Sequence, residues 1–161
     1  MSIKVGDKLP DVTFRVLSAE GPKPVSTSEI FSGKKVALFA VPGAFTPTCH
    51  QKHLPSFLAH IDEFKKKGVD SIVCIAVNDP FVLGAWEDIT GAKGKVLFLS
   101  DGNAEFTKKI GMDFDGSGFG LGTRSKRYSM LVDDGVVKKL NIEDAPGKCE
   151  ISGGQTLLAQ L

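Results

Sequence analysis

This sequence of 161 residues is poor in cysteine, and the few that it has form no recognised pair. Its three cysteines include no Cys-x-x-Cys, which excludes a disulfide-stapled secreted scaffold, a zinc ribbon and the usual dithiol oxidoreductase motif. We therefore expect a reducing compartment in which one thiol can be reactive. We expect the cytoplasm, and an organelle is the alternative if a transit peptide has been removed.

An excess of charge and a long apolar run are also missing. Lys and Arg total 20 against 19 Asp and Glu, so the net charge of +1 gives no field that would gather nucleic acid or anionic lipid. The longest apolar run, 36–41, is far shorter than the roughly 18 residues that a membrane span needs. Neither nucleic acid nor a membrane is expected as a partner.

The length and composition predict one domain over residues 1–161. The chain is close to the roughly 150 residues of a single domain, and 42% hydrophobic with 24% charged residues is an ordinary globular mix. No internal repeat, linker or low-complexity segment divides it.

Apolar runs and turn residues alternate along this domain. Strands are predicted at 12–16, 35–41, 69–77, 96–99, 127–132 and 136–142, the last two forming a hairpin across the Asp-Gly at 134–135. Helices are predicted from a capping box at 26–29 to Gly33, and at 46–67, 80–90, 104–110 and 155–160. This order predicts an α/β three-layer sandwich, in which helices cover both faces of a largely parallel sheet with an antiparallel edge.

In such sheets ligands bind beyond the carboxyl ends of the strands, so the segment after Val41 is the first candidate site. Thr46 is a natural N-cap there and Pro47 suits the first helical position, which places Cys49 in the first turn of a helix. Unpaired backbone N–H groups and the helix dipole favour a thiolate at that position. The Thr46 hydroxyl lies near enough in sequence to bond the sulfur or a ligand.

Two histidines next to this cysteine raise the question of a metal. Cys49, His50 and His53 form C-H-x-x-H, but one turn offers at most three ligands and no distant cluster completes a tetrahedron. No metal site and no cofactor are predicted, and a Cys–His hydrolase would need a third group to hold its base. We expect His53 to cap or pack within its own helix, which Pro55 kinks.

The other cysteines and the basic residues are less distinctive. Cys74 lies inside a buried strand, where packing explains it, and Cys149 lies in a polar stretch with an open role. The glycine-rich run at 116–122 lacks the pattern of a phosphate loop and indicates flexible backbone. Arg124 is expected as a solvated surface charge, whereas Arg127 begins a strand from which its guanidinium can face the end of the sheet.

Together these residues resemble a known family. Pro42-x-x-x-Thr46-x-x-Cys49 matches the peroxiredoxin active-site motif, and with the downstream Arg127-Tyr-Ser-Met the whole chain is similar to the type II, peroxiredoxin-five-like subfamily. The resemblance implies a thioredoxin-like fold and a thiol-dependent peroxidase that reduces hydrogen peroxide and alkyl hydroperoxides. Cys49 would be the peroxidatic cysteine, whose thiolate attacks a peroxide oxygen and becomes a sulfenic acid.

The same resemblance implies roles for the surrounding residues. Arg127 would activate the sulfur and polarise the O–O bond, and Thr46 would hydrogen-bond the peroxide. Pro42 would shield the sulfenate from water, and the backbone N–H groups of Thr48 and Cys49 would hold the peroxide oxygens.

The resemblance leaves the second half of the cycle open. Cys74 lies at the spacing from Cys49 that some type II members use for a resolving cysteine, and Cys149 lies near the chain end, where the animal members carry theirs. Neither is assigned, and our hypothesis is a one-cysteine cycle reduced by glutathione with glutaredoxin, or by thioredoxin. The family also suggests a homodimer packed through the active-site loops. The alternative function is a non-catalytic thioredoxin-like module for binding or redox sensing.

Overall fold

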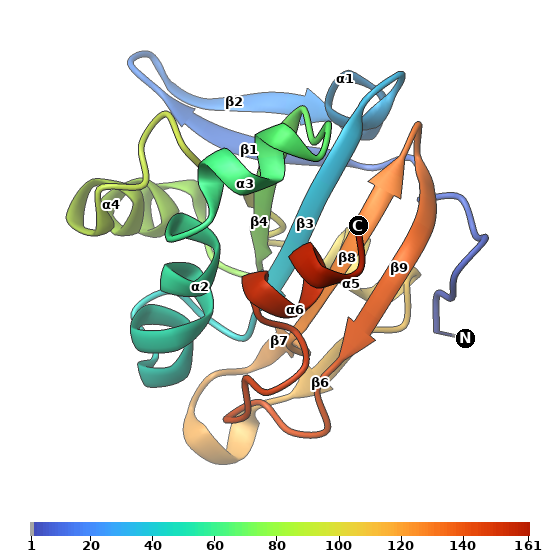
Figure 1. Cartoon of the computed structure of the whole chain (residues 1–161). Helices are drawn as coiled ribbons and strands as arrows, with labels where there is room; N and C mark the ends of the chain where they lie inside the picture. The colour runs from blue at the N-terminus through green and yellow to red at the C-terminus, as the bar shows by residue number, and fades with distance from the viewer. Residues whose placement is uncertain (1) are drawn as a thin grey trace.

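A computed structural model describes residues 2–161, in which helices cover both faces of a seven-stranded mixed sheet (Figure 1). The strand order is β2-β1-β5-β4-β3-β8-β9, and β6 and β7 form a separate two-stranded sheet. The strands are β1 Thr13–Ser18, β2 Gly21–Ser26, β3 Lys35–Val41, β4 Ser71–Ala76, β5 Leu97–Ser100, β6 Asp113–Asp115, β7 Thr123–Ser125, β8 Tyr128–Asp133 and β9 Val136–Ile142. The helices are α1 Thr27–Phe31, α2 Leu54–Leu58, α3 Ile61–Lys66, α4 Pro80–Thr90, α5 Glu105–Lys109 and α6 Gly154–Ala159. The predicted α/β sandwich is confirmed.

Three parallel strands form the centre of the sheet. β3 pairs with β4 and β4 with β5, and their continuous apolar sequences reflect burial on both faces. Alternate side chains of β3 enter two separate cores, one with α1 and α5 and the other with α2, α3, α4 and α6. The carboxyl ends of β3 and β4 therefore open onto loops that lead into helices of the second face.

Antiparallel strands flank the centre on both sides, which makes the sheet less parallel than the sequence pattern predicts. The predicted hairpin β8–β9 is confirmed, with Asp134 and Gly135 both in the left-handed region at φ 50° and 79°. The strand β2 was not predicted, because Pro22 and Pro24 suppress the strand pattern. Its place at the edge of the sheet explains why the prolines are tolerated.

The helix predicted at 46–67 is divided into three pieces. After Pro47 and Thr48 comes a π-helical turn, η1 Cys49–His53, in which the Leu54 N–H donates to the Cys49 carbonyl five residues earlier. This wide turn gives room to the ring of Pro55, which would otherwise meet the carbonyl four residues before it. The chain leaves helical geometry again at His60 before α3 begins. Within residues 2–161 no helix has the length and apolarity to cross a membrane.

Candidate active site

Cys49 lies in the first turn of the helical segment that follows β3, as the sequence predicts. The Thr46 carbonyl accepts the first helical bond from the His50 N–H at 2.9 Å, so Thr46 is the N-cap residue. Its hydroxyl, however, donates to the Gly43 carbonyl at 2.7 Å instead of capping the helix. The backbone N–H groups of Thr48 and Cys49 have no acceptor among residues 2–161, so two donors stay free beside the sulfur.

The buried guanidinium of Arg127 contacts the buried sulfur of Cys49. Arg127 precedes β8 and is 2% exposed, Cys49 has no exposed surface, and Nη2 donates to Sγ at 2.9 Å. No carboxylate lies within ion-pair distance of Arg127 in residues 2–161. The Cys49 sulfur thus takes the place beside this buried cation that a carboxylate fills in an ordinary ion pair.

Three further contacts fix the guanidinium. Its Nε and Nη2 donate to the Pro146 carbonyl at 3.1 and 3.0 Å, and its Nη1 lies 2.9 Å from Nδ1 of His53. The other ring nitrogen of His53, Nε2, lies 2.9 Å from the Ser152 carbonyl. His53 packs against Phe57 of its own helical segment, as predicted, with the ring centroids 5.8 Å apart, but the prediction missed its contacts with Arg127 and Ser152. The four-residue spacing from Cys49, which puts both side chains on one helical face, was the available signal.

A segment that we call the C-terminal strap, residues 143–152, supplies both carbonyls. Oε2 of Glu143 accepts hydrogen bonds from the backbone N–H of Glu150, Ile151 and Ser152 and from the Ser152 hydroxyl, at 2.6 to 3.0 Å. Burial opposes ionisation of Glu143, but these hydrogen bonds outweigh it and hold its pKa below the usual value. The charged carboxylate therefore organises the strap.

Side chains of Arg124 and Asn78 also fix the loop that joins β3 to the helical segment carrying Cys49. Arg124 Nη1 donates to the Pro42 carbonyl at 3.0 Å, and Asn78 Oδ1 accepts from the Ala44 N–H at 2.9 Å. A Cβ on Gly43 would lie 2.4 Å from Arg124 Nη1, so a side chain there would displace the guanidinium from the Pro42 carbonyl. Arg124 is thus a structural contact of the loop, and the expectation of a solvated surface charge is wrong.

His50 faces a different neighbour from His53. The Trp86 indole N–H donates to His50 Nδ1 at 3.0 Å, which ties α4 to the helix that carries Cys49. No group of three residues that could hold a metal ion occurs within residues 2–161.

The two remaining cysteines lie in contrasting places. Cys74 is fully buried in β4 opposite Phe39, and burial first, then the charge of Cys49, raises its pKa. Cys149 is half-buried in the strap, and its burial also raises its pKa.

The Thr48 hydroxyl donates to the Gly147 carbonyl at 3.0 Å, which holds the strap against the turn that contains Cys49.

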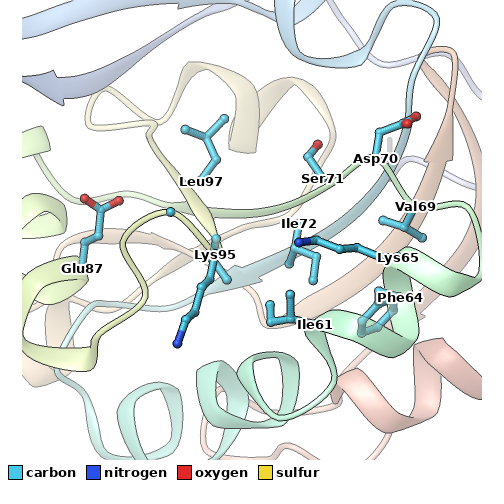
Figure 2. A pocket seen from close by; sticks show the side chains of 12 residues that line it. Ile61, Phe64, Lys65, Val69, Asp70, Ser71, Ile72, Glu87, Lys95 and Leu97 are labelled. Carbon is cyan, nitrogen blue, oxygen red and sulfur yellow. The ribbon is translucent and has the colours of Figure 1, made fainter.

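A cavity of about 390 Å³ lies at the opposite end of the parallel strands (Figure 2). Side chains of α3, the starts of β4 and β5, and the segment after α4 line it, among them Phe64, Lys65, Ile72 and Lys95. None of the predicted site residues reaches this cavity. The candidate chemistry is therefore carried by the buried sulfur and its cation at the carboxyl ends of the strands.

The chain is similar to known proteins in both sequence and fold. A family model described as Redoxin matches residues 4–158. Peroxiredoxin-2E, chloroplastic, from Arabidopsis thaliana is 54% identical over 147 residues, which are 89% of this chain and 63% of that relative. The chain thus spans less than two thirds of the length of this relative.

Two solved structures cover almost the whole chain. Reduced Prx3 in complex with H₂O₂ from Vibrio vulnificus has a TM-score of 0.92 and 48% identity, with 98% of each chain covered. A structure titled a putative thioredoxin reductase from Burkholderia cenocepacia has a TM-score of 0.95 and 43% identity, with 100% of this chain and 99% of that chain covered. Both therefore match the present fold over nearly its whole length.

Proposed function

The chain belongs to the redoxin family and within it to the peroxiredoxins, thiol-dependent peroxidases of thioredoxin-like fold, and from this we propose that it reduces hydrogen peroxide and small alkyl hydroperoxides through Cys49. One observation carries the proposal: the buried Arg127 guanidinium lies 2.9 Å from the buried Cys49 sulfur and pairs with no carboxylate in residues 2–161. The Vibrio neighbour, whose title names H₂O₂, supports the choice of oxidant.

The first step of the proposed reaction is a displacement at oxygen. The Cys49 thiolate attacks the terminal oxygen of the peroxide, an S–O bond forms and the O–O bond breaks. Sulfur is oxidised to a sulfenic acid, and the departing hydroxide or alkoxide takes a proton to leave as water or alcohol. Negative charge moves from sulfur to the leaving oxygen, so preorganised donors at that point lower the barrier.

We assign the remaining roles from the positions of the donors. Arg127 Nη2 stabilises first the thiolate and then the charge that moves onto the peroxide. The free N–H groups of Thr48 and Cys49 donate hydrogen bonds to the peroxide oxygens. The Thr46 hydroxyl oxygen accepts a hydrogen bond from the peroxide O–H while its own O–H keeps donating to the Gly43 carbonyl. Pro42, buried at the end of β3, shields the sulfenic acid from water.

The sulfenic acid is then reduced by an external thiol. Its hydroxyl leaves as water when a thiol forms a disulfide with Cys49, and a second thiol releases Cys49 as the reduced cysteine. Glutathione with glutaredoxin, or thioredoxin, supplies these electrons in our proposal. Burial of Cys74 inside β4 argues against it as an internal resolving cysteine, and Cys149 in the strap is the better placed of the two.

We also infer a homodimer and a reducing compartment. Several large apolar side chains at the site end of the molecule are exposed: Phe45, Phe81, Phe119 and Ile151. A second copy of the chain would cover them. All three cysteines are free, which a reducing cytoplasm or organelle interior would preserve, and the plant relative is named chloroplastic.

Stopped-flow oxidation of the reduced protein tests the peroxidase. We expect Cys49 to react with hydrogen peroxide far faster than free cysteine, Cys49→Ser to abolish turnover, and Arg127→Ala to slow it about 10²-fold to 10³-fold. Lys126→Ala is the matched control, because it removes an exposed cation next to Arg127 and should leave the rate unchanged. A Cys49 that reacts no faster than free cysteine would instead favour the non-catalytic binding or sensing module.

A further inference from the structure

The proposed reaction gives no task to His53, although this side chain is completely buried between the catalytic cation and the strap. The Ser152 carbonyl can only accept a hydrogen bond, and the Arg127 guanidinium can only donate one. The ring therefore carries its proton on Nε2, which donates to Ser152, and turns the lone pair of Nδ1 toward Arg127 Nη1.

Packing keeps the ring in this orientation. The rings of Phe39 and Phe57 lie 4.9 and 5.8 Å from the imidazole, centroid to centroid, and close it in from the strand and from α2. Cys49 and His53 are the two buried residues of the same π-helical turn. One turn of backbone thus carries both the sulfur and the acceptor that lie on either side of the guanidinium.

The ring is neutral at ordinary pH. Burial, followed by the positive charge of Arg127, lowers the pKa of His53 from 6.5 to about 3, and the weaker influences of Ser152 and Glu143 act in the other direction. Protonation would also place an N–H against the donating Nη1, so the contact exists only with the neutral ring.

Neutrality matters because of what else Arg127 touches. Besides the Cys49 sulfur and His53, the guanidinium bonds only the Pro146 carbonyl in residues 2–161, and this carbonyl is neutral like the His53 ring. A carboxylate at the place of His53 would form a charge-assisted pair with the guanidinium and so weaken its hold on the thiolate.

We propose that His53 is a positioning residue that holds the Arg127 guanidinium against Cys49 Sγ and, as a neutral acceptor, leaves the charge of Arg127 available to the sulfur. The effect of His53 on the reaction with peroxide rests on the proposed function, whereas its contact with Arg127 does not. The same geometry governs every reaction of the Cys49 thiolate, including alkylation.

Three substitutions separate the contact from the charge. His53→Asn keeps an acceptor oxygen near the place of Nδ1, whereas His53→Gln keeps a donor for Ser152 but loses the acceptor for Arg127. His53→Asp has the shape of His53→Asn with a negative charge added. All are made in the full chain carrying Cys74→Ser and Cys149→Ser, so that Cys49 is the sole thiol. Rates of reaction with hydrogen peroxide and with iodoacetamide are measured against pH, with thermal unfolding as the check on folding.

We expect His53→Asn to stay within about tenfold of the parent for both reagents, and His53→Gln and His53→Asp to fall about 10²-fold in reaction with peroxide. The pH–rate profiles of the last two should move to higher pH, which a purely structural defect would not cause. His53→Gln as fast as His53→Asn would overturn the contact, and His53→Asp as fast as His53→Asn would overturn the role of charge.

A second measurement needs no variant. Nitrogen NMR of the unmodified chain at neutral pH should show His53 as the neutral tautomer protonated on Nε2, and a cationic ring or the other tautomer would refute the proposal. Failure of the proposed function is distinguishable, because a protein inert to peroxide but with the expected order of alkylation rates would retain the positioning role alone.

Discussion

At the scale of single residues, three buried side chains of the site, Arg127, Glu143 and His53, offset or avoid the free-energy cost of a buried charge in different ways. Arg127 stays charged against the Cys49 sulfur, Glu143 stays charged through four hydrogen bonds, and His53 avoids charge altogether. The burial of a charged group without such partners would cost several kcal/mol. The three groups are connected by hydrogen bonds. Glu143 organises the strap, and two carbonyls of the strap contact Arg127 and His53.

Stability should therefore fall on acidification in two stages. The pKa of His53 is about 3 in the fold against 6.5 for the free side chain, so its contribution is complete above about pH 6.5 and is lost toward pH 3, by at most about 1.4 kcal/mol per pH unit. Glu143, whose folded pKa is also depressed, contributes above its usual value of 4.5 and loses that contribution below it.

Urea unfolding at a series of pH values measures both stages. His53→Asn should flatten the dependence between about pH 6.5 and 4.5. Glu143→Gln should remove part of the fall below that range and leave the upper stage in place. A free energy of unfolding of the unmodified chain that stays constant from pH 7 to pH 5 would contradict the assignment of His53.

At the scale of elements, the positions of Cys74 in a central strand and of Cys149 in the strap bear on which of them can reach the Cys49 sulfenic acid. Cys74 is paired on both sides, since β4 lies between β3 and β5, and its movement toward Cys49 would break the centre of the sheet. Cys149 belongs to a segment outside the sheet, which hydrogen bonds to Glu143, Thr48, Arg127 and His53 hold in place. Even so, the raised pKa of Cys149 makes it a poor nucleophile.

We therefore expect a one-cysteine cycle. Cys74→Ser and Cys149→Ser should each keep turnover with glutathione and glutaredoxin within about twofold, a change of less than about 1 kcal/mol in the barrier. Mass spectrometry after treatment with peroxide and glutathione should find the tripeptide on Cys49. Loss of turnover in Cys149→Ser, with a Cys49–Cys149 disulfide in the parent, would instead assign Cys149 as the resolving cysteine.

At the scale of the whole molecule, the exposed phenylalanines of residues 2–161 gather at one end. Phe45, Phe81 and Phe119 lie at the end that carries Cys49, on the loop after β3, the first turn of α4 and the turn between β6 and β7. Phe119 is 86% exposed, which is costly for so large an apolar group unless another surface covers it. This distribution fits the homodimer that we infer, with its interface around the site.

Sedimentation of the reduced protein tests that interface. We expect a dimer of the 17.2 kDa chain, and we expect Phe119→Ser to weaken it at least about tenfold, since burial of a phenylalanine contributes about 1.5 to 3 kcal/mol. Ile89→Ser is the control, because Ile89 is 69% exposed on α4 away from these loops and should not change the assembly. A monomer at all accessible concentrations would refute the interface.

The sequence by itself determined the central strands, the Asp-Gly hairpin and the placement of Cys49 in a first helical turn. These features depend on local rules: continuous apolar runs, turn residues that accept left-handed backbone, and a Thr-Pro helix start. The family motif added Arg127 as the partner of Cys49. The edge strand β2 escaped prediction because its prolines oppose the strand pattern and only its neighbour β1 makes it a strand.

Only the tertiary structure decided what surrounds the sulfur. The contacts of Arg127 with His53, of His53 with Ser152 and of Arg124 with Pro42 join residues that lie 74, 99 and 82 positions apart. No local pattern encodes such pairs, since each depends on how the sheet and the strap bring distant segments together. Burial decided the rest: it makes His53 neutral, and it places the Arg127 guanidinium, which pairs with no carboxylate in residues 2–161, against the Cys49 sulfur.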